Sequence, residues 1–443
     1  MAYYKRLFLL ALPLAFQHLI TVSLNLIDNV MVGRLGAFPL AAVGTANQVY
    51  GIYEMILFGL FSGAAVLVAQ YFGAKDYKKI KSIFGMDLAI GLTLAVLTLT
   101  VVQLFPEQIL RLFTSEPEVI VLGIDYIRIA SFTYLTIGVS FAIAYNCRAV
   151  QSVKFPTLIS VCCILINTVL NYMLIYGNFG CPELGVRGAA VATLAARIIE
   201  MIALITYLVL DKKHPLHGKL GEYRDFSTKL FQSMMKTAAP VVLSEGGWAL
   251  GVALVFAAYG RISAEALAVV QVSSIICKIC QCTMFALGNA SAALTGQTLG
   301  AKNVELTLSH SRKFIKVQWC YNFLMAAVIL LLREPVTAIY DFDAATTEML
   351  HLTLTAYAIT QIPRMVAYSV QCGLLRAGGD TVFCMTVELA CNLVIEVVLA
   401  YFAVLALQLP LHLCLAVASV GNIIKAIVEY RRYLSQKWIH IIV

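Results

Sequence analysis

Charged residues are scarce in this sequence. Only 13% of its 443 residues are Asp, Glu, Lys or Arg, whereas 60% are hydrophobic and the mean hydropathy is +0.85. Ordinary soluble domains carry about 25% charged residues, so a soluble fold of this size is excluded. The net charge of +8 is spread over many loops rather than gathered on one face, and nucleic acid is therefore not an expected partner.

Motifs for metal-dependent chemistry are also missing. No pair of Asp-rich motifs is present that could bind magnesium beside a diphosphate, which argues against an intramembrane prenyl transferase. Cys277, Cys280 and Cys282 have a metal-like spacing, but no histidine lies near them and Lys278 stands between them. We expect these thiols to pack as small apolar side chains. The sequence predicts neither an enzyme nor a cofactor.

Long apolar runs are what the sequence has instead. They recur from end to end at about 20 residues or more, the length a helix needs to cross roughly 30 Å of hydrocarbon. The first run is too long for the core of a signal peptide, so we expect it to be a membrane span. Lipid-exposed spans have to be helical. The sequence predicts an all-α membrane protein with twelve spans, near residues 7–33, 40–71, 83–105, 119–147, 156–176, 186–210, 233–259, 266–298, 314–332, 347–375, 382–406 and 410–430.

Basic residues predict the orientation. If the N-terminus is cytoplasmic, the inner segments hold most of the 32 Lys and Arg residues, with Arg376 and Lys425 counted among them. This asymmetry predicts a multi-pass protein of the inner (plasma) membrane with both termini in the cytoplasm. Only five basic residues then fall in outer loops: Arg34, Arg111, Arg187, Arg261 and Arg333.

An internal repeat relates the two halves of the chain. Shifting the sequence by 227 residues matches Pro13 with Pro240, and it matches the segment Gln70–Lys75 with Gln297–Lys302 at four positions. Each half contains six spans, so the halves are parallel repeats of the kind found in transporters that alternate access between two lobes. We expect an N-terminal lobe over residues 1–215 and a C-terminal lobe over residues 216–443, joined by the polar stretch from Asp211 to about Lys229.

One carboxylate, Asp28, lies deep in the first apolar run. Such a group costs roughly 2.5–3.5 kcal/mol near the bilayer centre on insertion scales, so it is normally turned toward a partner or a wet cavity. Either Asp28 only hydrogen-bonds a neighbouring helix, or it binds an ion or a proton. Asn167 and Asn171, four residues apart on one face of the fifth span, and Thr193 on the sixth could converge on it. Each of these three could also serve only to join helices.

The second half has acids of its own. Glu245 follows Pro240 in the seventh span, and Glu388 and Glu396 lie in the eleventh. Pro13 and Pro240 each remove a helical hydrogen bond, so we expect the first and seventh spans to be able to bend there. A bend in the helix that carries a titratable group is a candidate conformational switch.

Several segments together resemble the multidrug and toxic compound extrusion (MATE) transporters. They are Asp28-Asn-Val-Met-Val-Gly-Arg-Leu-Gly36, Gln70-Tyr-Phe-Gly-Ala-Lys75, the stretch from Asn171 to Ala190, Ser244-Glu-Gly-Gly-Trp248 and Leu375-Arg-Ala-Gly-Gly-Asp-Thr381. The resemblance covers essentially the whole chain. It implies two six-helix bundles around a central V-shaped cavity, and export of organic cations such as drugs and dyes in exchange for protons or sodium.

The resemblance also assigns roles to residues. Asp28 matches the family's first-span acid, Pro13 the proline at which that helix bends, and Asn167 and Thr193 polar members of the first-lobe site. Asn171 departs from the many relatives that carry an aspartate there, so the like-charge repulsion that strengthens proton binding is missing. Met365 stands where the sodium-coupled branch carries an aspartate, so Glu245 would act without that partner. Both departures favour coupling through Asp28 by protons, with sodium at Asp28 as the other possibility.

The leading interpretation is therefore a secondary multidrug efflux antiporter that works as a monomer in the lipid bilayer. A flippase for lipids or lipid-linked oligosaccharides, from the same superfamily, is the alternative. A flippase predicts a strongly cationic cavity for phosphate groups, whereas several acids lie within the spans of this chain. The major facilitator superfamily also has twelve spans, but its basic loop after the second span follows another pattern.

Overall fold

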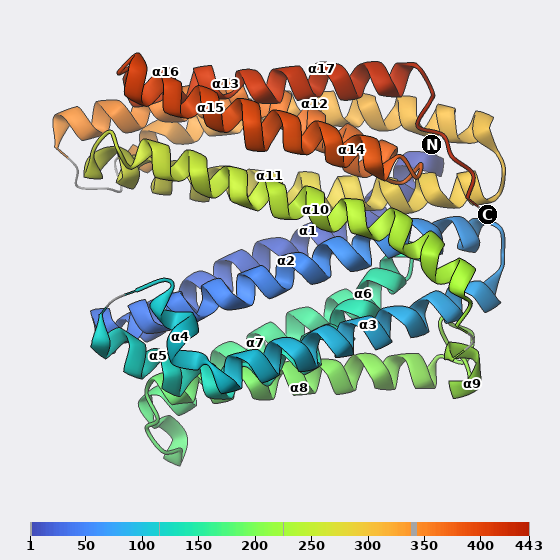
Figure 1. Ribbon diagram of the computed structural model, residues 1–443, viewed down its shortest axis with the longest axis horizontal. Helices are drawn as coiled ribbons and strands as arrows, with labels where there is room; N and C mark the ends of the chain where they lie inside the picture. Colours follow the sequence, from blue (N-terminus) through green and yellow to red (C-terminus); the bar gives the residue numbers. More distant parts are fainter. Residues whose placement is uncertain (1, 115, 225, 338–342, 443) are drawn as a thin grey trace. The chain divides into compact units, whose positions relative to one another are not determined.

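The computed structural model describes residues 2–114, 116–224, 226–337 and 343–442, and all regular structure within them is helical (Figure 1). The figure labels follow the chain from N to C. The helices are α1 (Ala2–Gly33), α2 (Ala37–Gly73), α3 (Tyr77–Leu104), α4 (Pro106–Arg111), α5 (Pro117–Ala130), α6 (Thr133–Ala149), α7 (Lys154–Tyr176), η1 (Asn178–Gly180), α8 (Val186–Leu210), α9 (Leu220–Tyr223), α10 (Thr228–Tyr259), α11 (Ala264–Gly300), α12 (Val304–Thr337), α13 (Ala344–Val370), η2 (Gln371–Leu375), α14 (Thr381–Glu388), η3 (Leu389–Glu396), α15 (Val397–Tyr401), η4 (Phe402–Ala406), α16 (Leu411–Ala418) and α17 (Val420–Leu434).

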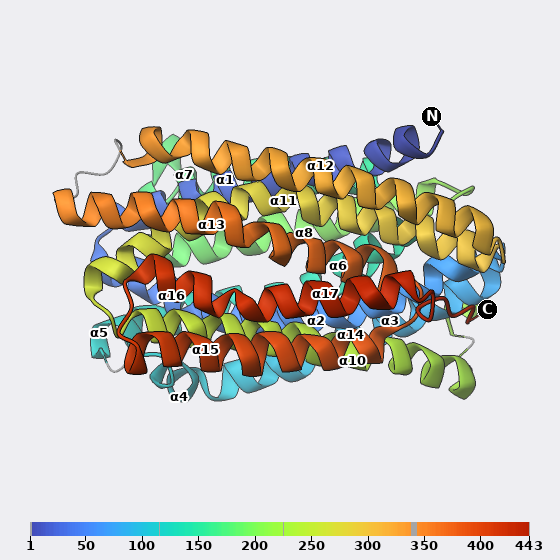
Figure 2. The same cartoon turned by 90° about the horizontal axis from the view of Figure 1, so that it is seen from above.

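The structure agrees with the predicted arrangement of twelve long helical spans. In the described ranges, ten helices are long and apolar enough to cross a membrane, and the pair α5–α6 makes an eleventh if it counts as one bent span. The remaining predicted span, 347–375, corresponds to α13, a helix of 27 residues that carries Glu348, His351 and Arg364. Figure 2 shows these helices from a second direction.

The predicted span 119–147 is not one straight helix. It divides into α5 and α6, which meet at an angle of 50°. The hydroxyl of Thr133 donates to the carbonyl of Ala130 at 2.6 Å, and that of Ser131 donates to the carbonyl of Arg128 at 3.3 Å. Hydroxyl groups that bond the preceding turn compete with the helical backbone pattern and bend helices.

The structure separates into two compact units. Unit 1 comprises residues 1–15, 69–74 and 236–443, and unit 2 comprises residues 16–68 and 75–235. Unit 2 therefore continues through the polar linker, which contains the short helix α9, and ends after the first residues of α10. The boundary at residue 215 and the V-shaped arrangement of two lobes stay predictions.

The sequence repeat produces a reciprocal helix contact within unit 1. A Cβ atom on Gly73 would collide with the backbone of Gln297, and one on Gly300 would collide with the backbone of Gln70. The C-terminal ends of α2 and α11 therefore pack backbone against backbone, with no space for a side chain between them. After these ends, Lys75 and Lys302 both adopt left-handed backbone conformations, with φ of 61° and 56°.

Candidate functional site

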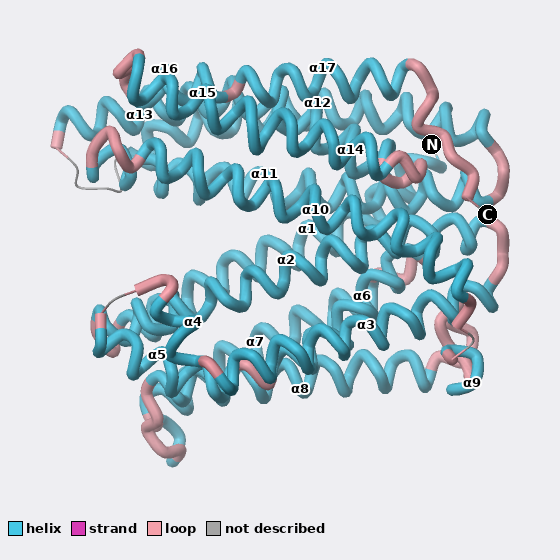
Figure 3. The backbone as a smooth tube through the Cα atoms, in the orientation of Figure 1, coloured by secondary structure: helices cyan, strands magenta, loops and turns pink. Residues whose placement is uncertain are grey.

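Four residues predicted to form a site converge within unit 2. Asp28 lies on α1, Asn167 and Asn171 lie one turn apart on α7, and Thr193 lies on α8, which packs along α7 (Figure 3). Nδ2 of Asn171 donates to Oδ1 of Asp28 at 3.0 Å. The amide of Asn167 is satisfied when its nitrogen donates to Oδ2 of Asp28 at 3.1 Å and its oxygen accepts from the backbone N–H of Thr193 at 3.3 Å. Each carboxylate oxygen thus receives one amide donor.

Neighbouring tyrosines surround this group. The hydroxyl of Tyr176, at the end of α7, donates to the carbonyl of Met31 at 2.7 Å and ties α7 to the helix that carries Asp28. Tyr126, on α5, hydrogen-bonds Thr193 and lies close enough to Asp28 to interact with its charge. The position of Asp28 is therefore determined by α5, α7 and α8 together.

Asp28 opens onto a cavity of about 360 Å³ that lies entirely within unit 2. This volume accommodates water and part of a small organic molecule. Its lining is mixed in character, with apolar side chains beside amides, hydroxyls and charged groups. The polar and aromatic members are Thr21, Asn25, Asp28, Asn29, Asn47, Tyr50, Glu54, Tyr126, Thr133, Tyr134, Asn167, Asn171, Thr193, Arg197 and Glu200.

A second charged group lines the same cavity. Nη1 of Arg197 donates to Oε2 of Glu200 at 2.7 Å, and the hydroxyl of Ser160 donates to Oε1 of Glu200 at 2.7 Å. Glu54 hydrogen-bonds Tyr50 and interacts electrostatically with Arg197. Within this cavity Arg197 thus stands between two carboxylates, Glu54 and Glu200.

Asp28 has no such basic partner. Among the residues whose placement is described, its side chain is bonded by amides and forms no ion pair with Lys, Arg or His. Three carboxylates, those of Asp28, Glu54 and Glu200, face the cavity with a single guanidinium, that of Arg197. An ionised lining would therefore be negative overall.

Glu245 lies in unit 1 and has a different environment. Its Oε1 accepts from Nη1 of Arg376 at 2.5 Å, and Nη2 of Arg376 donates to the hydroxyl of Ser244 at 3.0 Å. The side chains of Arg376 and Glu245 are only 8% and 12% exposed. Arg376 and Lys425, which the sequence analysis counted as charges of inner segments, are both buried in ion pairs. They contribute to helix packing, and the orientation stays a prediction.

The two proline positions lie within continuous helices. Helix α1 is unbroken from Ala2 to Gly33 through Pro13, and α10 is unbroken from Thr228 to Tyr259 through Pro240. The division between the two units falls next to Pro13, after Ala15. A missing backbone hydrogen bond at that point makes the helix easier to bend there.

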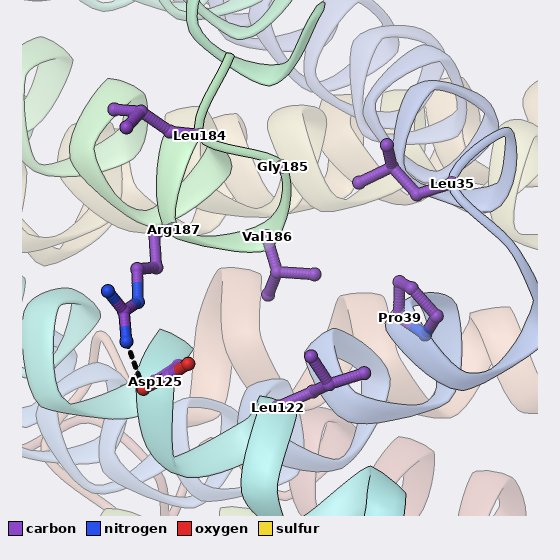
Figure 4. A pocket seen from close by; sticks show the side chains of 8 residues that line it. All are labelled: Leu35, Pro39, Leu122, Asp125, Leu184, Gly185, Val186 and Arg187. Atoms are coloured by element: carbon purple, nitrogen blue, oxygen red, sulfur yellow. Dashed lines mark hydrogen bonds and ion pairs between the residues drawn. The ribbon is translucent and has the colours of Figure 1, made fainter. Parts of the chain in front are cut away.

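A second cavity, of about 350 Å³, lies elsewhere in unit 2 (Figure 4). It is lined mainly by apolar side chains, with Leu35 and Pro39 on one side and Leu122 and Val186 on the other. Its two charged residues, Asp125 and Arg187, are paired with each other at 2.9 Å. No unpaired charge is thus available among the residues that line this cavity.

The cysteines of α11 pack in apolar surroundings. Cys277 and Cys280 are buried against Ile329 and Ala358. In the described parts of the chain, no group of three or more His, Cys, Asp or Glu side chains is arranged to hold a metal ion.

Sequence reasoning missed Tyr50 and Glu200 as cavity residues. The spacing of Arg197 and Glu200, three positions apart, is the signal of an ion pair along one helix face. Ser160, on the neighbouring helix α7, could be connected to them only in three dimensions.

A bundle of apolar helices with a polar, acid-containing cavity inside one compact unit is typical of membrane transporters. The MatE family model matches residues 13–173 and 240–402, and the chain belongs to this family of transporters. The two matched segments correspond to the two halves of the sequence repeat.

Curated relatives and solved structures agree with this assignment. The chain is 24% identical over 416 residues to the probable multidrug resistance protein YoeA of Bacillus subtilis, covering 93% of this chain and 87% of that protein. It is 24% identical over 438 residues to the probable multidrug resistance protein NorM of Thermotoga maritima, covering 98% and 93%.

The fold is similar to that of a MATE transporter crystallised in a bent conformation, with a TM-score of 0.89, 21% identity, and coverage of 98% of this chain and 96% of the other. The fold is equally similar to that of a MOP superfamily transporter from Pyrococcus furiosus, with a TM-score of 0.89, 20% identity and the same coverage. That transporter is described as having a binding pocket of reverse polarity, which suggests a different function.

Proposed function

We propose that this protein is a secondary multidrug efflux antiporter that exports organic cations in exchange for protons, with Asp28 as the coupling residue. The observation that carries the proposal is the environment of Asp28: a carboxylate at a cavity, bonded only by neutral amides. Such a group can gain and lose a proton without breaking an ion pair. Its partners Asn167, Asn171 and Thr193 are the proposed members of the coupling site.

The lining of the cavity supports a cationic substrate. Three carboxylates face one guanidinium, so the cavity attracts positive charge. Tyr50, Tyr126 and Tyr134 add aromatic faces, which attract organic cations. The names of the relatives YoeA and NorM support drugs and dyes as the class of substrate.

The proton and the substrate cation compete for the negative charge of Asp28, and this competition results in their exchange across the membrane. An ionised Asp28 contributes to the negative charge that holds an organic cation in the cavity. Protonation from the outer side removes that charge and turns the carboxylate into a hydrogen-bond donor, so its bonds to the two amides have to rearrange. Bending of α1 near Pro13 would convert this local change into a different helix shape. Pro240 offers the same possibility to α10.

Sodium at Asp28 is the second candidate for the coupling ion. Sodium binding requires several oxygen ligands, and Asn167, Asn171 and Thr193 could supply them beside Asp28 only if the two amides, which now direct their nitrogens at the carboxylate, turned over. Only one carboxylate is present in this group, however, and the second-half position that carries an aspartate in the sodium-coupled branch is the buried Met365. Both features favour the proton.

Glu245 is proposed as a partner of Arg376 rather than as the principal coupling acid. Its ion pair with Arg376 keeps the carboxylate charged, because removing that charge would leave a buried guanidinium without compensation. We further propose a location in the inner (plasma) membrane with both termini cytoplasmic, on the basis of the distribution of basic residues. A monomer is the proposed working unit, because both proposed acids lie within one chain.

Transport by purified protein in vesicles tests the proposal. We expect a fluorescent organic cation such as ethidium to move against its gradient when a pH gradient is imposed, and this movement to stop when the pH gradient is dissipated. Movement driven only by a sodium gradient would support the second coupling ion. Scrambling of labelled lipid without movement of the dye would instead support the flippase, which requires a cationic cavity.

A further inference from the structure

Unit 1 contains a group of buried charges that the proposed role of Asp28 does not use. Three buried or half-buried bases each face an acid. Arg376 is bonded to Glu245 at 2.5 Å, and Lys425 is bonded to Glu388 at 2.6 Å. The third base, Arg364, faces Glu396, which is also hydrogen-bonded by Asn422.

Glu429 is the acid that remains without a base of its own. Its side chain is completely buried, at 0% exposure, and within the described residues neither carboxyl oxygen has a hydrogen-bond partner. The charged and titratable groups that face it are Lys425 from its own helix α17, Glu388 and Cys384 from α14, Cys391 from η3, and Arg376 from the turn after η2. The nearest base, Lys425, is already bonded to Glu388.

A carboxylate in this position would be a buried charge without a donor. Such a group costs several kcal/mol to maintain, so it takes up a proton instead. The neutral acid is compatible with the surroundings as they stand, because the bases around Glu429 are already matched by other acids.

The surroundings also provide a way to release that proton. Lys425 precedes Glu429 by four residues on α17, so the two side chains lie on one helix face. If Glu429 loses its proton, the ammonium group of Lys425 can move from Glu388 to Glu429 and compensate the new charge. One lysine between two carboxylates therefore has two arrangements that differ by one proton.

The backbone around this group is irregular. Helix α14 continues through the π-helical segment η3 directly after Glu388, and α13 continues through the π-helical segment η2, which contains Gln371. Nδ2 of Asn392 in η3 donates to Oε1 of Glu388, and Gln371 in η2 lies near the same carboxylate. Irregular turns of this kind often occur where a helix adapts to a functional site.

We propose that Glu429, with Lys425 and Glu388, forms a second proton-binding site, and that its proton is transported together with the one bound at Asp28. The inference rests on the proposed function, because it adds a proton to the exchange. One proton exchanged for one monovalent cation moves no net charge, whereas two protons move one positive charge. The site thus predicts that export responds to membrane potential as well as to the pH gradient.

The experiment compares wild type with Glu429→Gln in vesicles, and uses Glu348→Gln, at an exposed acid of unit 1, as the control. With a membrane potential and no pH gradient, wild type and Glu348→Gln should accumulate ethidium on the electrically positive side, against its passive tendency. Glu429→Gln should not accumulate it, but should still respond to a pH gradient by about tenfold per pH unit, as one-to-one exchange requires. Voltage-driven accumulation by Glu429→Gln would overturn the proposal, as would a wild type that responds to pH alone.

These outcomes separate the two proposals. If wild-type export ignores the pH gradient, the proposed function itself fails. If it follows pH but not voltage, the coupling at Asp28 stands and only the second proton is lost.

Infrared spectroscopy provides a second test that does not need transport. Wild-type protein at neutral pH should show the carbonyl stretch of a protonated carboxylic acid that Glu429→Gln lacks. If that variant does not fold, Glu429→Asp should shift the band. An unchanged band in whichever variant is obtained would overturn the assignment of the proton to Glu429.

Discussion

Nδ2 of Asn171 lies 3.0 Å from Oδ1 of Asp28 and donates a hydrogen bond to it. Replacing this amide by a carboxylate, Asn171→Asp, would place two acids at the same distance. Two carboxylates this close resist simultaneous ionisation and share a proton. We expect the pH at which export is half-maximal to move upward by about one unit or more, equivalent to at least about 1.4 kcal/mol of proton binding.

The measurement is the pH profile of dye export by the variant in vesicles. Thr168→Ser, a conservative change on the same helix at a hydroxyl that bonds its own helix backbone, serves as the control and should leave the profile in place. A profile of Asn171→Asp that coincides with that of wild type would show that residue 171 does not contact the coupling acid.

The ion pair of Glu245 and Arg376 should matter more for stability than for coupling. Glu245→Gln leaves the buried guanidinium of Arg376 without its carboxylate, and breaking a buried pair on one side typically costs about 3–5 kcal/mol. We expect a marked fall in the thermal unfolding temperature of the detergent-solubilised protein. The double variant Glu245→Gln/Arg376→Gln should recover part of the loss, because the uncompensated charge is gone. Equal stability of Glu245→Gln and wild type would contradict this assignment.

The contact of Gly300 with the backbone of Gln70 leaves no room for a methyl group. Gly300→Ala should destabilise the protein by about 1–3 kcal/mol through overpacking. Gly44→Ala is the matched control, because a Cβ atom there meets nothing within 4 Å. Thermal unfolding of the two variants should therefore differ, and equal unfolding temperatures would contradict the close contact between the ends of α2 and α11.

A histidine in the linker predicts a pH-dependent local stability. His214 is buried, its Nδ1 accepts from the backbone N–H of Leu216 at 3.2 Å, and burial lowers the pKa of its imidazole. The unfolded linker therefore binds more protons than the folded one at mildly acidic pH. The stabilisation is complete above the ordinary histidine pKa of about 6.5 and is lost as the pH falls below it.

Limited proteolysis of the linker at several pH values measures this effect. Cleavage of wild type between residues 211 and 219 should accelerate as the pH falls from 7 to about 5. His214→Asn cannot titrate in this range, so its cleavage should be independent of pH once the rates are normalised to an unstructured reference peptide. The same acceleration in both proteins would assign the effect to another group.

Much of the candidate site could be predicted from the sequence because it depends on helical periodicity. The spacing of Asn167 and Asn171 places both amides on one face, and the rarity of acids in membrane spans singles out Asp28. The repeat likewise predicted that the segments around Gly73 and Gly300 correspond, although not that each lies against the other.

Other features depend on contacts that no local pattern determines. Glu200 belongs to the cavity because Ser160 and Arg197 hold its carboxylate, and only one of these is near it in sequence. Glu429 stands out because the neighbouring bases are occupied by other acids, which requires the pairing of four helices to be known. The bend between α5 and α6 coincides with two hydroxyl groups that bond the preceding turn, and no proline marks it.

The most direct test of the account is the transport activity of Asp28→Asn. The amide keeps the size of the side chain and removes the ability to carry a proton. Dye export driven by a pH gradient should fall to the level of protein-free vesicles, while Asp125→Asn, at the ion-paired acid of the second cavity, should retain it. Equal membrane insertion of both variants, measured by quantitative immunoblotting, would exclude a folding defect. Full proton-driven export by Asp28→Asn would show that coupling lies elsewhere in the protein.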